Sequence, residues 1–468
     1  MAKLVWFRDD LRVLDNPALY AACNNSGESV YAVFLVSGTQ WKKHDWADIK
    51  IDLIKRRIKR LSEELASLNI QLLVLDAASF EDVPHLLVQV CKELDVSDVY
   101  FNSEVGVNEH RRDSLVEDTL RDEEIAARVF ENRAIYPPGS ILTGKGLPFT
   151  VFTPFKKAWL RKFQLEGLEC LGRPQPQAVS QPTQEFPQAA WPNSTSDSSH
   201  WPVDERSILD KLREFAEKSL HDYGEDRDFP AIDGTSHLSP YLTIGAISAR
   251  QCISRLLFNA QGDFHALSPG AQTWLSELIW RDFYRHLMVA YPKLSMHYNF
   301  KEGLASLEWN DDENMFEAWK NGQTGYPLVD AGMRQLNSTG WMHNRVRMVV
   351  ASFLTKHLLI DWRKGEQYFM RKLIDGDFAA NNGGWQWAAS TGADAVPYFR
   401  IFNPHLQAKR FDPDGSYIRR WIPELSDEEV KLATSGKTPQ FNNPSYPAPI
   451  VDHAQAREKA LKFFKRDD

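Results

Sequence analysis

Two hydrophobic periodicities divide this sequence into a strand-and-helix part and an all-helical part. In the first third, short β-branched and apolar runs alternate with amphipathic segments. The predicted strands are 3–7, 30–36, 71–76 and 98–102, and the predicted helices are 16–23, 48–68, 83–94 and 108–121. This alternation predicts an α/β fold with a parallel, doubly wound sheet. Ligands bind beyond the carboxyl ends of such strands, so we expect a ligand rim after Phe7, after Val36 and around Asn102–Glu109.

From residue 204 onward the apolar spacing is helical, and no strand alternation occurs. The predicted helices are 204–217, 248–259, 271–291, 315–321, 327–338, 344–357 and 367–373. Ser248 and Gln251 have the spacing of a capping box. The stretch Gly172–His200 is rich in Pro, Gln and Ser, which predicts an extended connector. We therefore expect an α/β domain at 1–135, a connector at 136–203 and an all-helical domain at 204–468.

Composition favours a cytoplasmic protein. No apolar run reaches the roughly 18 residues that span a bilayer, and no secretory signal precedes the first predicted strand. The four cysteines lie far apart and the histidines are scattered, so we expect neither a disulfide framework nor a bound metal. The net charge of −8 argues against nucleic acid, but basic residues become frequent beyond Arg334. Those residues form either a local basic face or an ordinary solvated helix surface.

Sequence motifs exclude the common hydrolase and dehydrogenase sites. The stretch Gly139–Gly146 (GSILTGKG) nearly spells a phosphate-binding P-loop, but Gly146 stands where the motif needs Ser or Thr to hold Mg²⁺. GxGxxG, GxSxG and HExxH motifs are absent from the sequence.

An unusual segment, DGDFAANNGGWQWAAS, occupies residues 375–390. It combines two carboxylates, two adjacent amides, a glycine pair and two tryptophans. We expect Gly383–Gly384 to form a turn. The chain has 15 tryptophans, most of them beyond residue 270. Packing accounts for several of these indoles, and a planar cofactor would account for more.

Five long motifs in fixed order closely resemble the DNA photolyase/cryptochrome family. They are WFRDDLRVLDNPAL, GTSHLSPYLTIGAIS, ELIWRDFYRHL, TGYPLVDAGMRQLNSTGWMHNRVRM and the segment at 375–390. The resemblance extends from residue 4 to about residue 452 and is greatest to bacterial class I cyclobutane pyrimidine dimer photolyases. It implies an N-terminal α/β domain and an all-α C-terminal domain that holds FAD. It also implies light-dependent repair: excited FADH⁻ donates an electron to the dimer, the ring splits, and the electron returns.

The resemblance also assigns the FAD contacts. They are Tyr223, Thr235, Ser236, Leu238, Ser239, Trp274, Glu277, Arg281, Trp341, Asn344, Arg347, Asp375, Asp377 and Asn381. Thr235–Ser239 correspond to the pyrophosphate clamp at the start of a helix, where an anion is favoured and where a plain helix cap is the alternative. Asn381 corresponds to the amide that accepts from flavin N5–H and cannot protonate a radical. Arg347 is the expected ion-pair partner of Asp375.

The tryptophans are assigned two roles. Trp385, Trp362 and Trp309 correspond to a chain that passes electrons from the surface to oxidised flavin, because indoles can be oxidised one electron at a time. Trp280 and Trp387 correspond to the walls that stack against the dimer. Trp319 is expected to be a core residue instead.

The expected partner is UV-damaged DNA, single- or double-stranded, with the dimer flipped out of the helix into the site. The predicted catalytic residues are Glu277, Asn344, Met348 and Asn381. Glu277 and Asn344 are expected to hydrogen-bond the pyrimidine edges, with Glu277 protonated, and Met348 is expected to make an apolar contact. The predicted DNA contacts are Trp280, Trp387, Arg345 and Arg400, and we expect a monomer.

Three related functions are the alternatives. A 6-4 photolyase has paired histidines in this motif, whereas here Asn344 follows His343 and Met348 replaces another histidine. Cryptochromes often carry long C-terminal tails, whereas this sequence stops at Asp468. A plain flavin electron carrier would not need the arginine-rich dimer pocket. Light-dependent repair of UV-damaged DNA separates these functions.

The antenna chromophore is the last expectation. Asn108 and Glu109 correspond to residues that hold 5,10-methenyltetrahydrofolate in folate-type relatives. Those relatives close the site with a Cys–Lys pair, for which Ser295 and Met296 stand here. We therefore expect a folate antenna, with a deazaflavin as the second choice.

Overall fold

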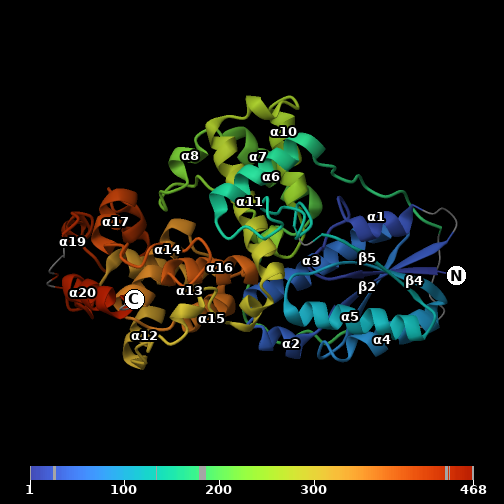
Figure 1. Ribbon diagram of the computed structural model, residues 1–468, viewed down its shortest axis with the longest axis horizontal. Coiled ribbons are helices and arrows are strands. Elements are labelled where there is room, and N and C mark those ends of the chain that lie inside the picture. The colour runs from blue at the N-terminus through green and yellow to red at the C-terminus, as the bar shows by residue number, and fades with distance from the viewer. Residues whose placement is uncertain are drawn as a thin grey trace. The chain divides into compact units, whose positions relative to one another are not determined.

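The computed structural model describes residues 2–24, 28–132, 134–178, 186–437, 441 and 443–465. The chain forms two compact units, shown in Figure 1: unit 1 is Met1–His221 with Ser236–Met296, and unit 2 is Asp222–Thr235 with His297–Asp468. Residues 179–185 of the predicted connector lie outside the described residues. The domain boundaries at 135 and 203 stay a prediction.

Unit 1 contains a five-stranded parallel sheet with the strand order β3-β2-β1-β4-β5. Its strands are β1 (Ala2–Phe7), β2 (Ser29–Val36), β3 (Gln71–Asp76), β4 (Val96–Asn102) and β5 (Ala126–Phe130). In β1, Leu4 pairs with Tyr31 on one side and Val99 on the other. The predicted parallel sheet is confirmed. Strand β5 was not predicted, because its short apolar run is interrupted by Arg128 at the sheet edge.

Alternate residues of the strands build one face of the core. Leu4, Trp6 and Phe101 lie on this face and are almost fully enclosed. The face is covered by α4 (Val83–Leu94) and α5 (Val107–Asp122). Figure 1 shows α1 (Pro17–Cys23) on the opposite side of the sheet, as a doubly wound fold requires.

The other helices of unit 1 are α2 (Gly38–Lys43), α3 (Asp48–Ala66), α6 (Phe152–Glu166), α7 (Glu205–Lys218), α9 (Ser239–Thr243), α10 (Ala249–Asn259) and α11 (Pro269–Ala290). Helices α2 and α6 were not predicted: α2 has only 6 residues, and α6 follows aromatic and β-branched residues that suggest a strand. The capping box is confirmed, because Ser248 accepts from the Gln251 backbone and the Gln251 side chain accepts from the Ser248 backbone.

The regular elements of unit 2 are helices throughout its described residues, with one isolated bridge between Asn310 and Ile360. Its helices are α8 (Tyr223–Asp226), α12 (Glu313–Lys320), α13 (Pro327–Thr339), α14 (Asn344–Ser352), α15 (Trp362–Lys372), α16 (Phe378–Ala389), α17 (Pro404–Phe411), α18 (Ser416–Trp421), α19 (Asp427–Ala433) and α20 (His453–Phe464). A π-helical turn, Phe353–His357, directly continues α14. Trp319 is fully buried in the core, as expected.

The expected turn at Gly383–Gly384 is wrong, because both glycines lie inside α16. The helix begins at an N-cap where the Asp377 side chain accepts from the Ala380 backbone N–H at 3.0 Å. It packs along α15, and Trp385 and Ala389 are buried. This packing outweighs the poor helix propensity of two glycines, about 1 kcal/mol each.

Replacing Gly384 by alanine is expected to raise the free energy of unfolding by about 0.5–1 kcal/mol, since alanine loses less backbone entropy in a helix. A Cβ at this position would meet no heavy atom within 4 Å. Gly365→Ala is the matched control: its Cβ would lie 2.2 Å from the Trp385 ring, so it should destabilise the fold by about 1–3 kcal/mol. Denaturant unfolding of both variants measures the difference. A destabilised Gly384→Ala protein would contradict the helical assignment.

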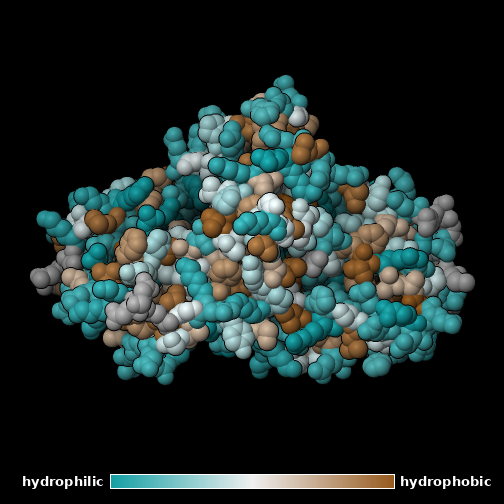
Figure 2. Space-filling model, in the orientation of Figure 1, coloured by the Kyte–Doolittle hydropathy of each residue, from teal (hydrophilic) through white to brown (hydrophobic). Residues whose placement is uncertain are grey.

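The viewed face of the surface is mainly hydrophilic, with apolar residues scattered among polar ones (Figure 2). Within the described residues, no helix combines the length and apolar character that crossing a membrane requires.

Candidate functional site

Helix α11 carries four of the predicted site residues of unit 1. Trp274, Glu277 and Arg281 follow one another at spacings that place them along one side of the helix. Trp274 is buried and its ring lies 5.0 Å from that of Phe215. Trp280, the fourth, is stacked on Phe152 at 3.6 Å between ring centroids and 8° between planes. One face of the Trp280 ring, which is predicted to stack against the dimer, is therefore covered by Phe152.

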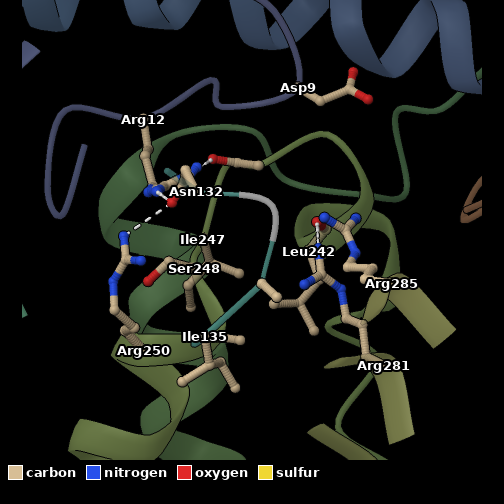
Figure 3. A pocket seen from close by; sticks show the side chains of 13 residues that line it. Asp9, Arg12, Asn132, Ile135, Leu242, Ile247, Ser248, Arg250, Arg281 and Arg285 are labelled. Atoms are coloured by element: carbon tan, nitrogen blue, oxygen red, sulfur yellow. Dashed lines mark hydrogen bonds between the residues drawn. The ribbon is translucent and has the colours of Figure 1, made fainter. Parts of the chain in front are cut away.

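A small cavity of unit 1 lies beside Arg281 (Figure 3). Its polar lining comes from Asp9, Arg12, Asn132, Ser248, Arg250, Arg281 and Arg285. Arg281 donates to the Leu242 carbonyl at 3.0 Å. Arg12 and Arg250 both donate to the Asn132 side-chain oxygen, at 3.3 and 2.9 Å. These hydrogen bonds tie the loop after β1 to the start of α10.

The two predicted antenna residues lie together at the start of α5. Asn108 Nδ2 lies 3.1 Å from His44 Nε2, and Glu109 Oε1 lies 3.4 Å from His44 Nδ1. Gln40 Nε2 lies 2.8 Å from the same Nε2 of His44. Because two amide N–H groups face Nε2, we assign this atom as the acceptor and Nδ1–H as the donor to Glu109.

Burial shifts both titratable groups of this cluster toward their neutral forms. It lowers the pKa of His44 to about 4, and Lys50 adds to the effect. It raises the pKa of Glu109 to about 8, with repulsion from Glu104 as the second cause. At neutral pH the cluster therefore offers hydrogen-bonding groups with little net charge.

In unit 2, the expected ion pair between Arg347 and Asp375 is confirmed. Arg347 Nη2 lies 2.8 Å and 3.1 Å from the two carboxylate oxygens of Asp375. Asp375 is buried, with only 7% of its surface exposed, and Arg347 Nε also donates to the Met342 carbonyl at 2.7 Å. The pair fixes α14 to the loop before α16.

The side chain of Asn381 has a defined orientation. Its Nδ2 donates to the Glu366 backbone carbonyl at 3.0 Å, so its Oδ1 is presented as an acceptor. The next residue, Asn382, donates to the Glu366 carboxylate at 3.0 Å, and His297 lies 3.0 Å from the other carboxylate oxygen. Glu366 thus holds both amides of the Asn381–Asn382 pair.

Helix α14 places three predicted contacts within two turns. Asn344 is exposed, and Arg345 and Met348 are partly exposed. Arg345 is paired with Asp228 at 2.6 Å, and its guanidinium lies 4.3 Å from the Phe411 ring centroid. Arg345 is therefore already engaged within the protein, unlike a freely solvated basic residue.

The three tryptophans of the predicted electron chain occupy adjoining segments of unit 2. Trp385 packs against α15 near its start, because a Cβ at Gly365 would meet its ring. Trp362, at the beginning of α15, is fully buried and donates to Asn299 Oδ1 at 3.0 Å. Trp309 lies in a segment that pairs with residues 359–360, just before Trp362, and it is partly exposed.

The remaining predicted residues fall in both units. Unit 1 holds Ser236, Leu238 and Ser239 around the start of α9. Unit 2 holds Tyr223, Thr235, Trp341, Asp377, Trp387 and Arg400. The partners of the predicted residues that sequence reasoning missed include His44 and Glu366. His44 lies in the expected rim loop after Val36, but neither residue belongs to a motif that would single it out.

Known proteins match this chain over its whole length. A family model described as "DNA photolyase" matches residues 3–180, and one described as "FAD binding domain of DNA photolyase" matches residues 274–466. The deoxyribodipyrimidine photo-lyase of Vibrio cholerae is 48% identical over 99% of both chains. That of Escherichia coli is 45% identical over 99% of this chain and 98% of the relative. A solved bacterial class III photolyase from Agrobacterium tumefaciens has a TM-score of 0.86 at 35% identity, covering 99% of this chain and 97% of that one. The chain belongs to the DNA photolyase family.

Proposed function

We propose that this protein repairs cyclobutane pyrimidine dimers in DNA with blue light and reduced FAD. The observation that carries the proposal is helix α16, which bears both the oriented Asn381 amide and the buried Trp385. The full-length similarity to deoxyribodipyrimidine photo-lyases supports the same activity. A redox cofactor contact and an electron relay on one helix suit light-driven electron transfer.

The residues of unit 2 fit a reduced flavin. The Asn381 oxygen is an acceptor for the N5–H of the flavin and carries no acidic proton. The positive charge of Arg347 compensates the carboxylate of Asp375. Asp375 can therefore lie next to the cofactor without being an unpaired buried charge. When bound and excited by light, FADH⁻ would supply the electron that opens the cyclobutane ring. We propose the FAD contacts assigned from the family motifs for both units.

Recognition of the dimer requires that its two linked pyrimidines leave the duplex, because a lesion inside the stack cannot reach a buried cofactor. We propose that Trp387 and Trp280 provide apolar walls for it, with Asn344 and Glu277 at the pyrimidine edges. Met348, on the same helix as Asn344, supplies a polarizable contact. Arg400 is exposed and suits a phosphate contact. Arg345 is proposed to contact a DNA phosphate while it stays paired with Asp228.

For the antenna we propose 5,10-methenyltetrahydrofolate at Asn108 and Glu109, with a deazaflavin as the alternative. The neutral cluster around His44 supports a ligand read by hydrogen bonds, such as a pterin ring. We further propose a monomeric, cytoplasmic protein.

Glu109→Gln is expected to keep the antenna bound at neutral pH, whereas Glu109→Ala should lose at least about tenfold in affinity. A protonated carboxyl and an amide both donate one hydrogen bond, and alanine cannot; one good hydrogen bond is worth about 1.4 kcal/mol or tenfold. The raised folded pKa also means that wild-type stability falls as pH rises from about 4.5 toward about 8, because in this range Glu109 is ionised in the unfolded chain but still protonated in the folded protein. Glu109→Gln should lack this decrease. Antenna absorbance and urea unfolding at several pH values test both results, and equal antenna loss in the two variants would contradict them.

Repair of defined lesions tests the proposed function. Chemically reduced protein is illuminated with oligonucleotides that carry a thymine dimer, a 6-4 photoproduct or no lesion. The proposal expects light-dependent loss of the dimer only. Reversal of the 6-4 photoproduct would instead identify the protein as a 6-4 photolyase. If neither lesion were reversed, a signalling protein or a flavin electron carrier would be the remaining functions.

A further inference from the structure

Lys356 is a buried amine to which the described residues offer no counter-charge. Its side chain lies in the π-helical turn Phe353–His357 and is fully enclosed. Its Nζ donates to Ser390 Oγ at 2.8 Å and lies 3.4 Å from the Phe464 ring centroid. In the part of the chain that the structure describes, no carboxylate reaches ion-pair distance of it. A buried charge in this situation is costly, so the amine favours its neutral form.

The charged and titratable groups around Lys356 do not compensate it. Lys301 donates to the Ser390 backbone carbonyl at 3.2 Å and repels Lys356, while Asp394 acts on Lys301. His357 and His453 are hydrogen-bonded to each other at 2.9 Å, and burial keeps the pKa of both below the usual value. Burial first and Lys301 second lower the pKa of Lys356 to about 7. The amine therefore changes charge near neutral pH.

This titrating amine lies close to the outermost tryptophan of the proposed electron chain. The Trp309 ring centroid is 5.9 Å from that of Phe464, and Phe464 is the ring that Lys356 contacts. The two contacts together place the ammonium within about 10 Å of the Trp309 indole, where unit charges interact appreciably across protein. π-helical turns recur at functional sites because they re-aim a side chain within a helix.

We propose that Lys356 controls the electron transfer from Trp309 to oxidised Trp362, and this inference rests on the proposed tryptophan chain. In that step one electron leaves Trp309, which becomes positively charged until an external thiol returns an electron. A protonated Lys356 opposes the positive charge on Trp309, and a neutral Lys356 does not. Lys356 is thus a positioning residue, because it acts on Trp309 only through its own charge. Electron transfer from Trp309, and with it light-driven reduction of the flavin, is therefore faster above pH 7 than below it.

The experiment measures the electron transfer from Trp309 to oxidised Trp362 in the flavin-loaded protein, by transient absorption after a laser flash, on both sides of pH 7. Wild type is expected to speed up by at least about threefold as pH rises through about 7. Lys356→Met should show the fast rate at both pH values, because a buried apolar side chain carries no charge. Lys356→Arg should stay slow at both, because arginine does not lose its proton in this range.

Lys364→Met is the matched control on the neighbouring helix. Lys364 Nζ lies 2.5 Å from Asp311, and this partner raises its pKa, so it keeps its charge throughout the range. This variant should retain the wild-type pH dependence. A pH dependence that persists in Lys356→Met, or a flat wild-type profile, would overturn the inference. Flavin content and circular dichroism identify a misfolded variant, and a flat wild-type profile overturns the inference even then.

Trp309→Phe separates this inference from the function on which it rests. If Trp309→Phe photoreduces like wild type, the assignment of Trp309 to the chain fails and the role of Lys356 fails with it. Repair by chemically reduced protein does not use the chain, so it tests the repair function independently of both.

Discussion

Trp385→Phe is expected to slow light-driven reduction of the flavin by more than about tenfold, while repair by chemically reduced protein stays close to wild type. Trp385 is buried, and its ring lies 4.9 Å from that of Phe369 and 6.0 Å from that of Trp319. A phenyl ring fills most of the same space but is much harder to oxidise than an indole. The substitution therefore removes one electron hop and leaves α16 in place.

Trp319→Phe is the matched control for this substitution. Trp319 is fully buried in the same cluster, and its indole N–H donates to the Val350 carbonyl at 3.1 Å. This variant should lose about 1–3 kcal/mol of stability through the lost hydrogen bond and the smaller ring. It should keep its rate of photoreduction. Transient absorption after a laser flash measures both variants, and equal rates in the two would contradict a specific role for Trp385.

Asp375→Ala is expected to have the largest effect on stability, a loss of about 3 kcal/mol, together with loss of bound flavin. Removing one partner of a buried ion pair leaves the other charge without compensation, which typically costs 3–5 kcal/mol. The lower end applies here, because 23% of the Arg347 side chain is exposed to solvent. Denaturant unfolding and the flavin-to-protein absorbance ratio measure the two effects.

Asp375→Asn is the companion variant, because it keeps the shape and the hydrogen-bond acceptor but removes the charge. We expect an intermediate loss of stability and partial retention of flavin. Full stability and full flavin content in Asp375→Ala would show that the ion pair holds neither the fold nor the cofactor site.

The features that could be predicted from the sequence are those that depend on a local residue pattern or on a motif. The apolar runs of the strands and the amphipathic helices are enough to predict the parallel sheet and the all-helical unit, and spacing alone predicts the capping box at Ser248 and Gln251. The Arg347–Asp375 pair was expected from the resemblance to the family, and the structure contains it. Gly383–Gly384 was misread as a turn, because packing of α16 against α15 overrides local propensity.

What the sequence did not predict depends on contacts between distant segments. His44 meets Asn108 across 64 positions, and Lys356 meets Ser390 across 34, and no motif contains both residues of either pair. Glu366 looks like an ordinary helical glutamate in the sequence, yet in the structure it holds two amides and faces His297. Only the folded chain brings these partners together.

Loss of a thymine dimer from an oligonucleotide, in blue light and in darkness, tests the central claim most directly. The reduced protein is mixed with the dimer, and restoration of thymine is followed by its ultraviolet absorbance. We expect many dimers restored per protein molecule in the light and none in the dark. Equal restoration in the dark, or an unchanged dimer in the light with flavin bound and reduced, would contradict the proposed function.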